Sequence, residues 1–435
     1  MIEYCEHTLP GGLTLITHVD RTTPMVALNM LYRVGARNES PDRTGFAHLF
    51  EHLMFSGTRR FPDYDAEVNG MGGESNAFTN NDFTNYYLTV PADGLELALQ
   101  LELDRMTGLD VSQRALDVQR QVVTEEYKQR YLNQPSGDVW MLLRGLCYKV
   151  HPYRWATIGA DIRHVQEATL DDVRAFHARH YRPDNAILAV CGNFDSEQRV
   201  LDIISTLKAK SEKREAKLDQ SEKRKAKSET GSKREARSEN VQLKAEPEQT
   251  GRRELEVCRN VPSDTIYKAY HMGGRLSDDY YVCDLMTDIL SNGHSSRLYD
   301  HLVRRDGLMS EVNAYITGDV DPGLLVVTGK LAAGVTMERA EAAIDAELAA
   351  LATDGVSAYE LEKVQNHYES TFAFSQYKAA DRAYSLCYYR MLGHTGWVNS
   401  EPDNYRRVTA EQLRATAERI FRRENENVMY YCKGE

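Results

Sequence analysis

The chain has 435 residues, too many for one hydrophobic core, and this length predicts two to four domains. Its hydrophobic content of 42% and charged content of 27% are ordinary for a globular protein. The formal net charge of −12 at pH 7 argues against general nucleic-acid binding. No run of about eighteen apolar residues occurs, so we expect no membrane-spanning helix and no membrane partner.

The N-terminal segment and the cysteines bear on the cellular compartment. Residues 1–6 lack a basic segment followed by an apolar one, so no signal peptide is expected in this sequence. The seven cysteines are scattered, odd in number and never arranged as C-x-x-C. This pattern favours buried free thiols in a reducing compartment over a disulfide framework, and it predicts a cytoplasmic protein. The cysteines are Cys5, Cys147, Cys191, Cys258, Cys283, Cys387 and Cys432.

The first predicted elements are strands. Residues 8–18 contain a Gly-Gly turn followed by alternating apolar and polar residues, which predicts a β-hairpin. Residues 25–34 predict a further strand. Residues 35–42 then form a loop that leads into a helix, and Asp42 or Thr44 would be its N-cap.

Residues 45–55 predict this helix, because their apolar side chains follow the i, i+3, i+4, i+7 spacing of a core-facing stripe. His48, Glu51 and His52 follow the same spacing, offset from that stripe. Two imidazoles one turn apart can supply two zinc ligands, and the carboxylate between them can reach a metal-bound water. In a chain with 13 histidines, the H-x-x-E-H order arises by chance in roughly one chain in thirty. In that case the two histidines would be ordinary polar surface residues.

The segment after the motif offers a further ligand. Residues 76–91 follow a glycine-rich turn and predict two short strands, which by themselves could be an ordinary edge hairpin. Helices are expected at 92–109 and 112–131. The second helix carries Glu125 and Glu126, and a carboxylate on a neighbouring helix would complete a site with three protein ligands. Without a further argument, one glutamate on a charged helix is more simply a solvated side chain.

The remaining elements predict an α+β fold made of layered sheets and helices. In the first half we expect a helix at 170–181, a buried strand at 186–191 and a second helix at 196–207. In the second half, a strand at 265–272, a glycine-containing loop and a helix at 278–290 repeat the order of elements seen at 25–55. We therefore expect two structurally related domains, with metal ligands only in the first.

A charged, repetitive segment separates the two halves, so we predict a first domain at 1–207, a linker at 208–252 and a second domain at 253–435. Between 210 and 244, 12 Lys or Arg stand against 7 Asp or Glu, a local charge of +5 that leaves −17 for the rest of the chain. Such a segment cannot bury a core and should be a mobile linker or a solvated, partly helical arm. Nucleic-acid contact is a weak alternative, because the segment lacks aromatic residues.

Taken together, these motifs resemble the pitrilysin/insulinase family of zinc metallopeptidases. The length resembles the small-subunit branch that includes mitochondrial processing peptidase. The segments that carry the resemblance are His48-Leu49-Phe50-Glu51-His52, Glu125-Glu126, Asn76-Ala77-Phe78-Thr79, Tyr86-Tyr87 and Ser295-Ser296-Arg297-Leu298. The resemblance implies two similar α+β domains and a zinc-dependent endopeptidase that acts on unstructured peptides.

Carried over residue by residue, the resemblance implies one Zn²⁺ per chain, bound by His48, His52 and Glu126, with Glu125 as the alternative third ligand. Glu51 would be the general base. The strand formed by Asn76, Ala77, Phe78 and Thr79 would bind an extended substrate by β-augmentation. Two chains facing each other, as a homodimer or a heterodimer, would enclose a chamber.

Two departures from the family pattern affect the expected activity. The family usually has a glutamate seven residues before the third ligand, where this chain has Gln119, so a carboxylate that tunes the metal site is missing. Active relatives commonly carry an Arg and a Tyr that bind the substrate carbonyl, at the positions of Val303 and Ser310. A partner chain of the same family that lacks the zinc motif would supply them. The alternative is a catalytically weak scaffold that binds peptides or a partner and keeps zinc for structural reasons.

Overall fold

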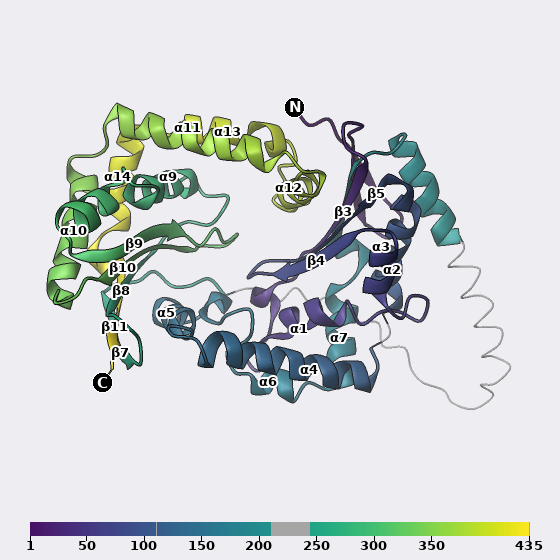
Figure 1. Cartoon of the computed structure of the whole chain (residues 1–435), viewed down its shortest axis with the longest axis horizontal. Helices are drawn as coiled ribbons and strands as arrows, with labels where there is room; N and C mark the ends of the chain where they lie inside the picture. Colours follow the sequence, from purple (N-terminus) through teal and green to yellow (C-terminus); the bar gives the residue numbers. More distant parts are fainter. Residues whose placement is uncertain (110, 210–243, 435) are drawn as a thin grey trace.

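A computed structural model describes residues 1–109, 111–209 and 244–434. It contains two β-sheets side by side, each layered with helices, which confirms the predicted α+β class (Figure 1). Most of the predicted linker, residues 210–243, lies outside the described residues. No helix within the described ranges has the length and apolar character needed to span a membrane.

The strands and helices occur close to the predicted positions. In the first half they are β1 (Cys5–Thr8), β2 (Thr14–Val19), β3 (Met25–Tyr32), α1 (Phe46–Leu53), α2 (Tyr64–Gly70), β4 (Glu74–Thr79), β5 (Thr84–Pro91), α3 (Leu95–Gly108), α4 (Gln113–Tyr127), α5 (Val139–Cys147), α6 (Arg163–Gln166), α7 (Leu170–His180), β6 (Ala186–Gly192) and a helix over 197–209. In the second half they are β7 (Arg253–Arg259), β8 (Thr265–His271), α9 (Tyr280–Ser291), β9 (Met309–Ile316), β10 (Leu324–Leu331), α10 (Met337–Thr353), α11 (Ala358–Ser375), α12 (Ala379–Met391), α13 (Trp397–Arg406), α14 (Ala410–Ile420) and β11 (Glu426–Lys433).

The two sheets have the same strand topology. The first has the order β1-β2-β6-β3-β5-β4, and the second has the order β7-β11-β8-β10-β9. Strands β2 and β6 pair in parallel, as do β7 and β11, and the other pairs in both sheets are antiparallel. The second sheet therefore repeats the first from β2 onward, which confirms the predicted relation between the halves.

Each sheet has one face covered by a helix that comes from the other half of the chain. Helix α12 of the second half packs on the first sheet, where Leu386 and Cys387 contact a fully buried apolar surface that includes Leu31. The Sγ atom of Cys387 donates a hydrogen bond of 3.3 Å to the carbonyl oxygen of Asn29 on β3. The opposite face of the first sheet is covered by helices of its own half, α1 and α3 among them.

The exchange is reciprocal, because α5 of the first half covers the second sheet. Its residues Leu143 and Cys147 share one buried cluster with Ala269, Val326 and Met429. Figure 1 shows α12 beside β3 and α5 beside the strands of the second sheet. Each predicted domain therefore completes the core of the other, so the halves are interlocked rather than joined only by a linker.

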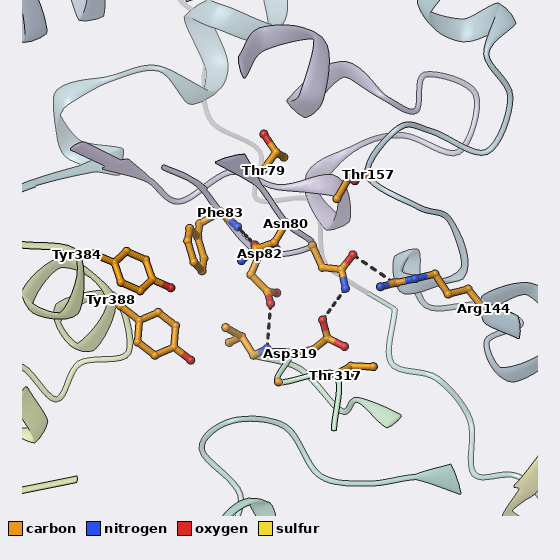
Figure 2. A pocket seen from close by; sticks show the side chains of 13 residues that line it. Thr79, Asn80, Asp82, Phe83, Arg144, Thr157, Thr317, Asp319, Tyr384 and Tyr388 are labelled. Carbon is orange, nitrogen blue, oxygen red and sulfur yellow. Dashed lines mark hydrogen bonds between the residues drawn. The ribbon is translucent and has the colours of Figure 1, made fainter. Parts of the chain in front are cut away.

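The hairpin turns of the two sheets meet at a polar seam between the halves. The carboxylate of Asp82 accepts a hydrogen bond of 2.9 Å from the backbone N–H of Val320, and the amide of Asn81 donates one of 2.5 Å to Asp319 (Figure 2). Arg37 pairs with Asp82 at 3.0 Å. Because Asn81, Asp82 and Asp319 are buried, the seam holds the hairpins in a fixed relation.

The end of the predicted linker, residues 244–252, is bound to the folded protein. The carboxylate of Glu246 accepts backbone hydrogen bonds of 2.7–2.9 Å from Lys149, Val150 and His151 in the first half. Gln249 donates to the carbonyl oxygen of Glu426 at 3.0 Å. The chain is therefore anchored before the predicted boundary at 253.

Candidate metal centre

Helix α1 carries the H-x-x-E-H motif on a firmly buried support. Phe46, Leu49, Phe50 and Leu53 are buried in the first core, as the apolar spacing predicts. The helix begins at Gly45, whose φ of +86° and close approach to the backbone of Ile158 leave no room for a Cβ. This fixed start sets the direction in which the motif side chains project.

A buried glutamate, rather than the predicted N-cap residues, holds the start of α1. The carboxylate of Glu39 accepts hydrogen bonds from the backbone N–H groups of Gly45 and Ala47, at 2.9 and 2.8 Å. The predicted caps Asp42 and Thr44 were wrong, because the cap position is Gly45 and the Thr44 hydroxyl bonds elsewhere. Glu39 lies six residues before the cap, outside the spacing of ordinary capping motifs.

The motif histidines meet one carboxylate oxygen of Glu126 on α4. Oε2 of Glu126 lies 3.5 Å from Nε2 of His48 and 3.3 Å from Nε2 of His52. The three ligand atoms lie within 4.8 Å of one another. Tetrahedral zinc with N and O ligands at 2.0–2.2 Å separates its ligand atoms by about 3.3–3.5 Å. The three side chains therefore fit a zinc ion in both donor type and spacing.

The helix rotation between Glu125 and Glu126 distinguishes the two candidate ligands. The side chain of Glu125 is 71% exposed and bonds Lys128 at 2.7 Å, whereas that of Glu126 is 16% exposed and faces the histidines. Arg130, one turn further, binds the other oxygen of Glu126 at 3.0 Å. Sequence reasoning missed Arg130, although its i+4 spacing from Glu126 is the usual signal for such a pair. The geometry favours Glu126 over Glu125.

The local electrostatics suit metal binding. Burial lowers the pKa of His48, which keeps its imidazole neutral and able to bind a metal. Burial opposes ionisation of Glu126, but a hydrogen bond from His52 and nearby positive charges lower its pKa overall. Burial raises the pKa of Glu51, and a hydrogen bond from the Thr79 hydroxyl partly opposes this rise.

The predicted substrate-binding residues lie on an open sheet edge next to α1. Within residues 1–109, 111–209 and 244–434, strand β4 pairs only with β5, and no strand of these ranges lies on its other side. Asn76 and Phe78 project to the exposed side of β4, whereas Ala77 and Thr79 are half-buried. The backbone N–H of Ala77 donates a hydrogen bond of 2.8 Å to Oδ1 of the preceding residue, Asn76.

Gln119, Val303 and Ser310, the residues that depart from the family pattern, make no hydrogen bond with the candidate metal ligands in the described part of the chain. Gln119 is half-buried on α4, and its side chain makes no hydrogen bond within the described residues, so its influence on the metal stays a prediction. Val303 packs against the second core, and Ser310 on β9 donates to the carbonyl oxygen of Lys330 at 3.3 Å. The adjacent cations are engaged too: Arg304 and Arg305 both pair with Asp300.

A polar pocket of about 300 Å³ lies at the seam. Thr79, the last residue of β4, is one of the residues that line it. Figure 2 shows its lining from both halves: Tyr384 and Tyr388 of α12 lie on one side, Arg144 lies on the opposite side, and Asp319 lies between them. The pocket thus lies next to the edge strand, and the two sheets build it together.

The chain matches two family models in succession. Residues 14–152 match "Insulinase (Peptidase family M16)", and residues 167–368 match "Peptidase M16 inactive domain". The chain belongs to the M16 peptidase family. This confirms the family predicted from the motifs, while the mitochondrial branch stays a prediction.

Relatives of this M16 chain are named as zinc proteases. It is 27% identical to the zinc protease PqqE of Helicobacter pylori over 380 residues, covering 86% of this chain and 81% of that protein. It is 24% identical to an uncharacterized zinc protease of Rickettsia bellii, covering 95% and 94% of the two chains. Its fold matches a crystal structure of a protease from Helicobacter pylori with a TM-score of 0.87 and 24% identity, over 99% of this chain and 100% of that one. A Pseudomonas fluorescens structure titled as an M16 inactive domain matches with a TM-score of 0.81 and 17% identity, over 100% and 98%.

Proposed function

We propose that this M16 chain is a zinc-dependent endopeptidase, or the catalytic subunit of one, that hydrolyses unstructured peptides. The observation that carries the proposal is the position of Glu126 Oε2, 3.5 and 3.3 Å from the Nε2 atoms of His48 and His52. This is the ligand spacing of tetrahedral zinc. Names of relatives such as PqqE support zinc and proteolysis as the general chemistry.

In this proposal each side chain of the site has a defined task. His48, His52 and Glu126 hold the metal, and zinc bound there would polarise a peptide carbonyl and acidify water. Glu51 is the general base, because it lies between the two histidines in sequence, on the same helix. Its raised pKa reflects partial burial, which also strengthens its pull on a proton. Arg130 keeps Glu126 ionised and oriented.

The substrate would bind as an added strand along β4. Backbone pairing gives affinity with little sequence selectivity, and only an extended peptide can pair in this way. Folded proteins are therefore poor substrates. The position of Thr79, at the end of β4 and hydrogen-bonded to Glu51, would bring such a peptide close to the base.

The second part of the proposal is that a partner chain completes the site. Val303 and Ser310 occupy the positions where active relatives commonly have the Arg and Tyr that bind the substrate carbonyl. A family member without the zinc motif would supply these groups across a dimer chamber. The alternative is a peptide-binding scaffold with structural zinc, which the same two residues and the inactive-domain match favour.

The test uses the full chain alone and with its co-purifying proteins. The lone protein should bind zinc and cleave unstructured peptides slowly, and addition of the partner should raise the rate. Glu51→Gln should lower kcat by about 10²–10⁴-fold in both settings while zinc and peptide binding persist. Rapid cleavage by the lone chain would overturn the requirement for a partner. A Glu51→Gln variant that behaves like the wild type would favour the scaffold.

A further inference from the structure

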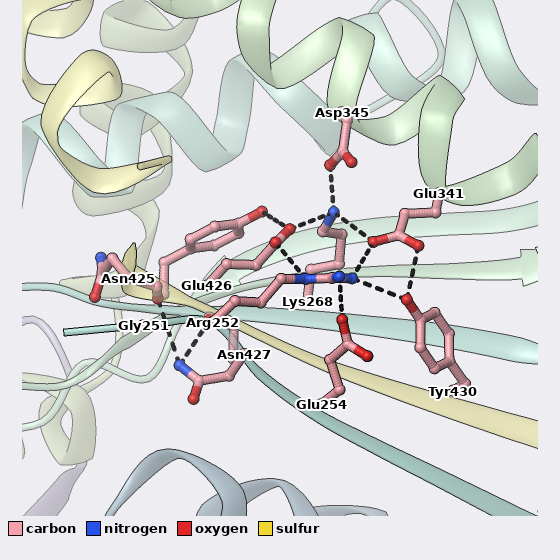
Figure 3. A network of polar contacts seen from close by, with 12 residues as sticks. Gly251, Arg252, Glu254, Lys268, Glu341, Asp345, Asn425, Glu426, Asn427 and Tyr430 are labelled. Carbon is pink, nitrogen blue, oxygen red and sulfur yellow. Dashed lines mark hydrogen bonds and ion pairs between the residues drawn. The ribbon is translucent and has the colours of Figure 1, made fainter. Parts of the chain in front are cut away.

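The described residues contain three groups of side chains with metal-ligand spacing. One is the centre on α1 and α4. The second consists of Glu341, Asp345 and Glu426, whose carboxylates surround the fully buried ammonium of Lys268 (Figure 3). In this group the Lys268 ammonium occupies the position that a metal ion would take. The third group is Glu256, Cys258 and Cys432. Among the described residues no ammonium or guanidinium pairs with their side chains, although Arg259 donates a hydrogen bond of 3.0 Å to the carbonyl oxygen of Cys258.

The third group lies on one face of the second sheet, at its edge. Strands β7 and β11 are parallel, and Cys258 is directly opposite Cys432 in their register. Leu255 and Val257 pack on the cluster that contains α5, so Glu256 and Cys258, which alternate with them, project to the other face. Both are exposed, and Cys432 is half-buried. The expectation of buried free thiols is confirmed for Cys147, Cys191, Cys283 and Cys387, and it is wrong for Cys5 and Cys258, which are exposed.

We propose that Glu256, Cys258 and Cys432 form a second metal site, which binds a thiophilic divalent cation such as Zn²⁺. Neighbouring strands lie about 4.8 Å apart, and tetrahedral zinc with Zn–S bonds of about 2.3 Å separates its sulfurs by about 3.8 Å. Two cysteines paired across parallel strands therefore reach one ion with little movement. A disulfide is harder to form, because it needs Cβ atoms about 3.8 Å apart, closer than the strand spacing.

The surroundings of the pair favour a cation. The largest electrostatic contributions to the pKa of Cys432 come from the thiol of Cys258 and from two acidic groups, Glu256 and Asp264. Burial and these groups raise the pKa of the Cys432 thiol to about 11. Binding of one M²⁺ forms two metal–sulfur bonds and releases the two thiol protons to water. The bound ion would tie β11, the last strand, to the edge strand β7.

The experiment measures metal binding by the full-length chain, reduced and stripped with chelator, and it does not depend on peptidase activity. With Co²⁺, the wild type should show the near-ultraviolet charge-transfer absorption of thiolate ligands, which a site made of His and Glu cannot give. Cys258→Ser and Cys432→Ser should each abolish this absorption and lower bound Zn²⁺ from about two to about one per chain. Cys5→Ser, which removes an exposed cysteine that belongs to none of the three groups, should leave both signals unchanged.

A second comparison separates this proposal from the centre on α1. His48→Ala should lose the other equivalent of zinc and keep the thiolate absorption of Co²⁺. Absence of thiolate absorption in the reduced wild type would overturn the proposal. Persistence of that absorption in Cys258→Ser would do the same, as would formation of a Cys258–Cys432 disulfide in the presence of excess Zn²⁺.

Discussion

The carboxylate of Glu126 lies 3.3 Å from Nε2 of His52, although the two residues belong to helices that are distant in sequence. The contact depends on the packing of α4 against α1, through buried residues such as Leu116 and Val123. Glu125, the preceding residue, points into solvent. The rotation of α4 thus decides which of the two glutamates faces the histidines.

Replacement of Glu126 and replacement of Glu125 should therefore have unequal effects on zinc affinity. Glu126→Gln should weaken zinc binding by more than about 100-fold, because it removes a charged ligand rather than an outer contact. Glu125→Gln, its neighbour on the exposed face, should leave zinc affinity within about twofold. Competition titration with a chelating dye measures both constants. Equal losses in the two variants would contradict the assignment of Glu126.

Binding along β4 should show the alternation of a strand. Peptides N-methylated at successive positions should lose affinity at every second residue, by roughly 2- to 10-fold for each lost hydrogen bond. The residues between should tolerate methylation, because their N–H groups face away from β4. Dissociation constants, measured by displacement of a fluorescently labelled peptide from the non-cleaving Glu51→Gln variant, provide the readout. A loss that is uniform along the peptide would exclude β-augmentation.

Because α12 and α5 each cover the sheet of the other half, we expect that neither half folds alone. Leu386 on α12 is fully buried against the first sheet, so Leu386→Ala should lower the free energy of unfolding by about 2–5 kcal/mol. Tyr377→Ala, at a site 83% exposed, should change it by less than about 0.5 kcal/mol. Urea unfolding followed by circular dichroism measures both.

Expression of the two halves as separate fragments tests the same packing of α12 and α5. Residues 1–207 expressed alone should aggregate, because α12 no longer covers the apolar face of the first sheet, and co-expression with 244–435 should restore a soluble complex. A monomeric, cooperatively folded fragment 1–207 would show that the halves are independent.

Glu39 should make stability depend on pH. Burial raises its pKa from 4.5 to about 8, so the folded protein holds this proton more tightly than the unfolded chain does. The resulting stability is present below about pH 4.5 and is lost as pH rises through 8, with a slope of up to about 1.4 kcal/mol per pH unit. In Glu39→Gln this loss between pH 5 and 9 should disappear, whereas in the exposed variant Glu362→Gln it should remain. Melting temperatures across that range provide the measurement.

Much of the site was predictable because its signals are local. The apolar stripe and the spacing of His48, Glu51 and His52 follow from the 3.6-residue helical period, which the sequence displays directly. The edge strand at 76–79 followed from a turn and a β-rich run. Glu39 was missed because its role depends on a loop that folds back, a contact with no fixed sequence spacing.

The sequence by itself determined the family, the repeat of two halves and the three motif residues on α1, because local periodicity and motif order encode them. Only the tertiary structure decided that Glu126, rather than Glu125, faces the histidines, since that depends on how α4 rotates against α1. It alone revealed the exchange of α5 and α12 and the pairing of Cys258 with Cys432. These relationships join residues far apart in the chain, and only the packing of the folded sheets brings them into contact.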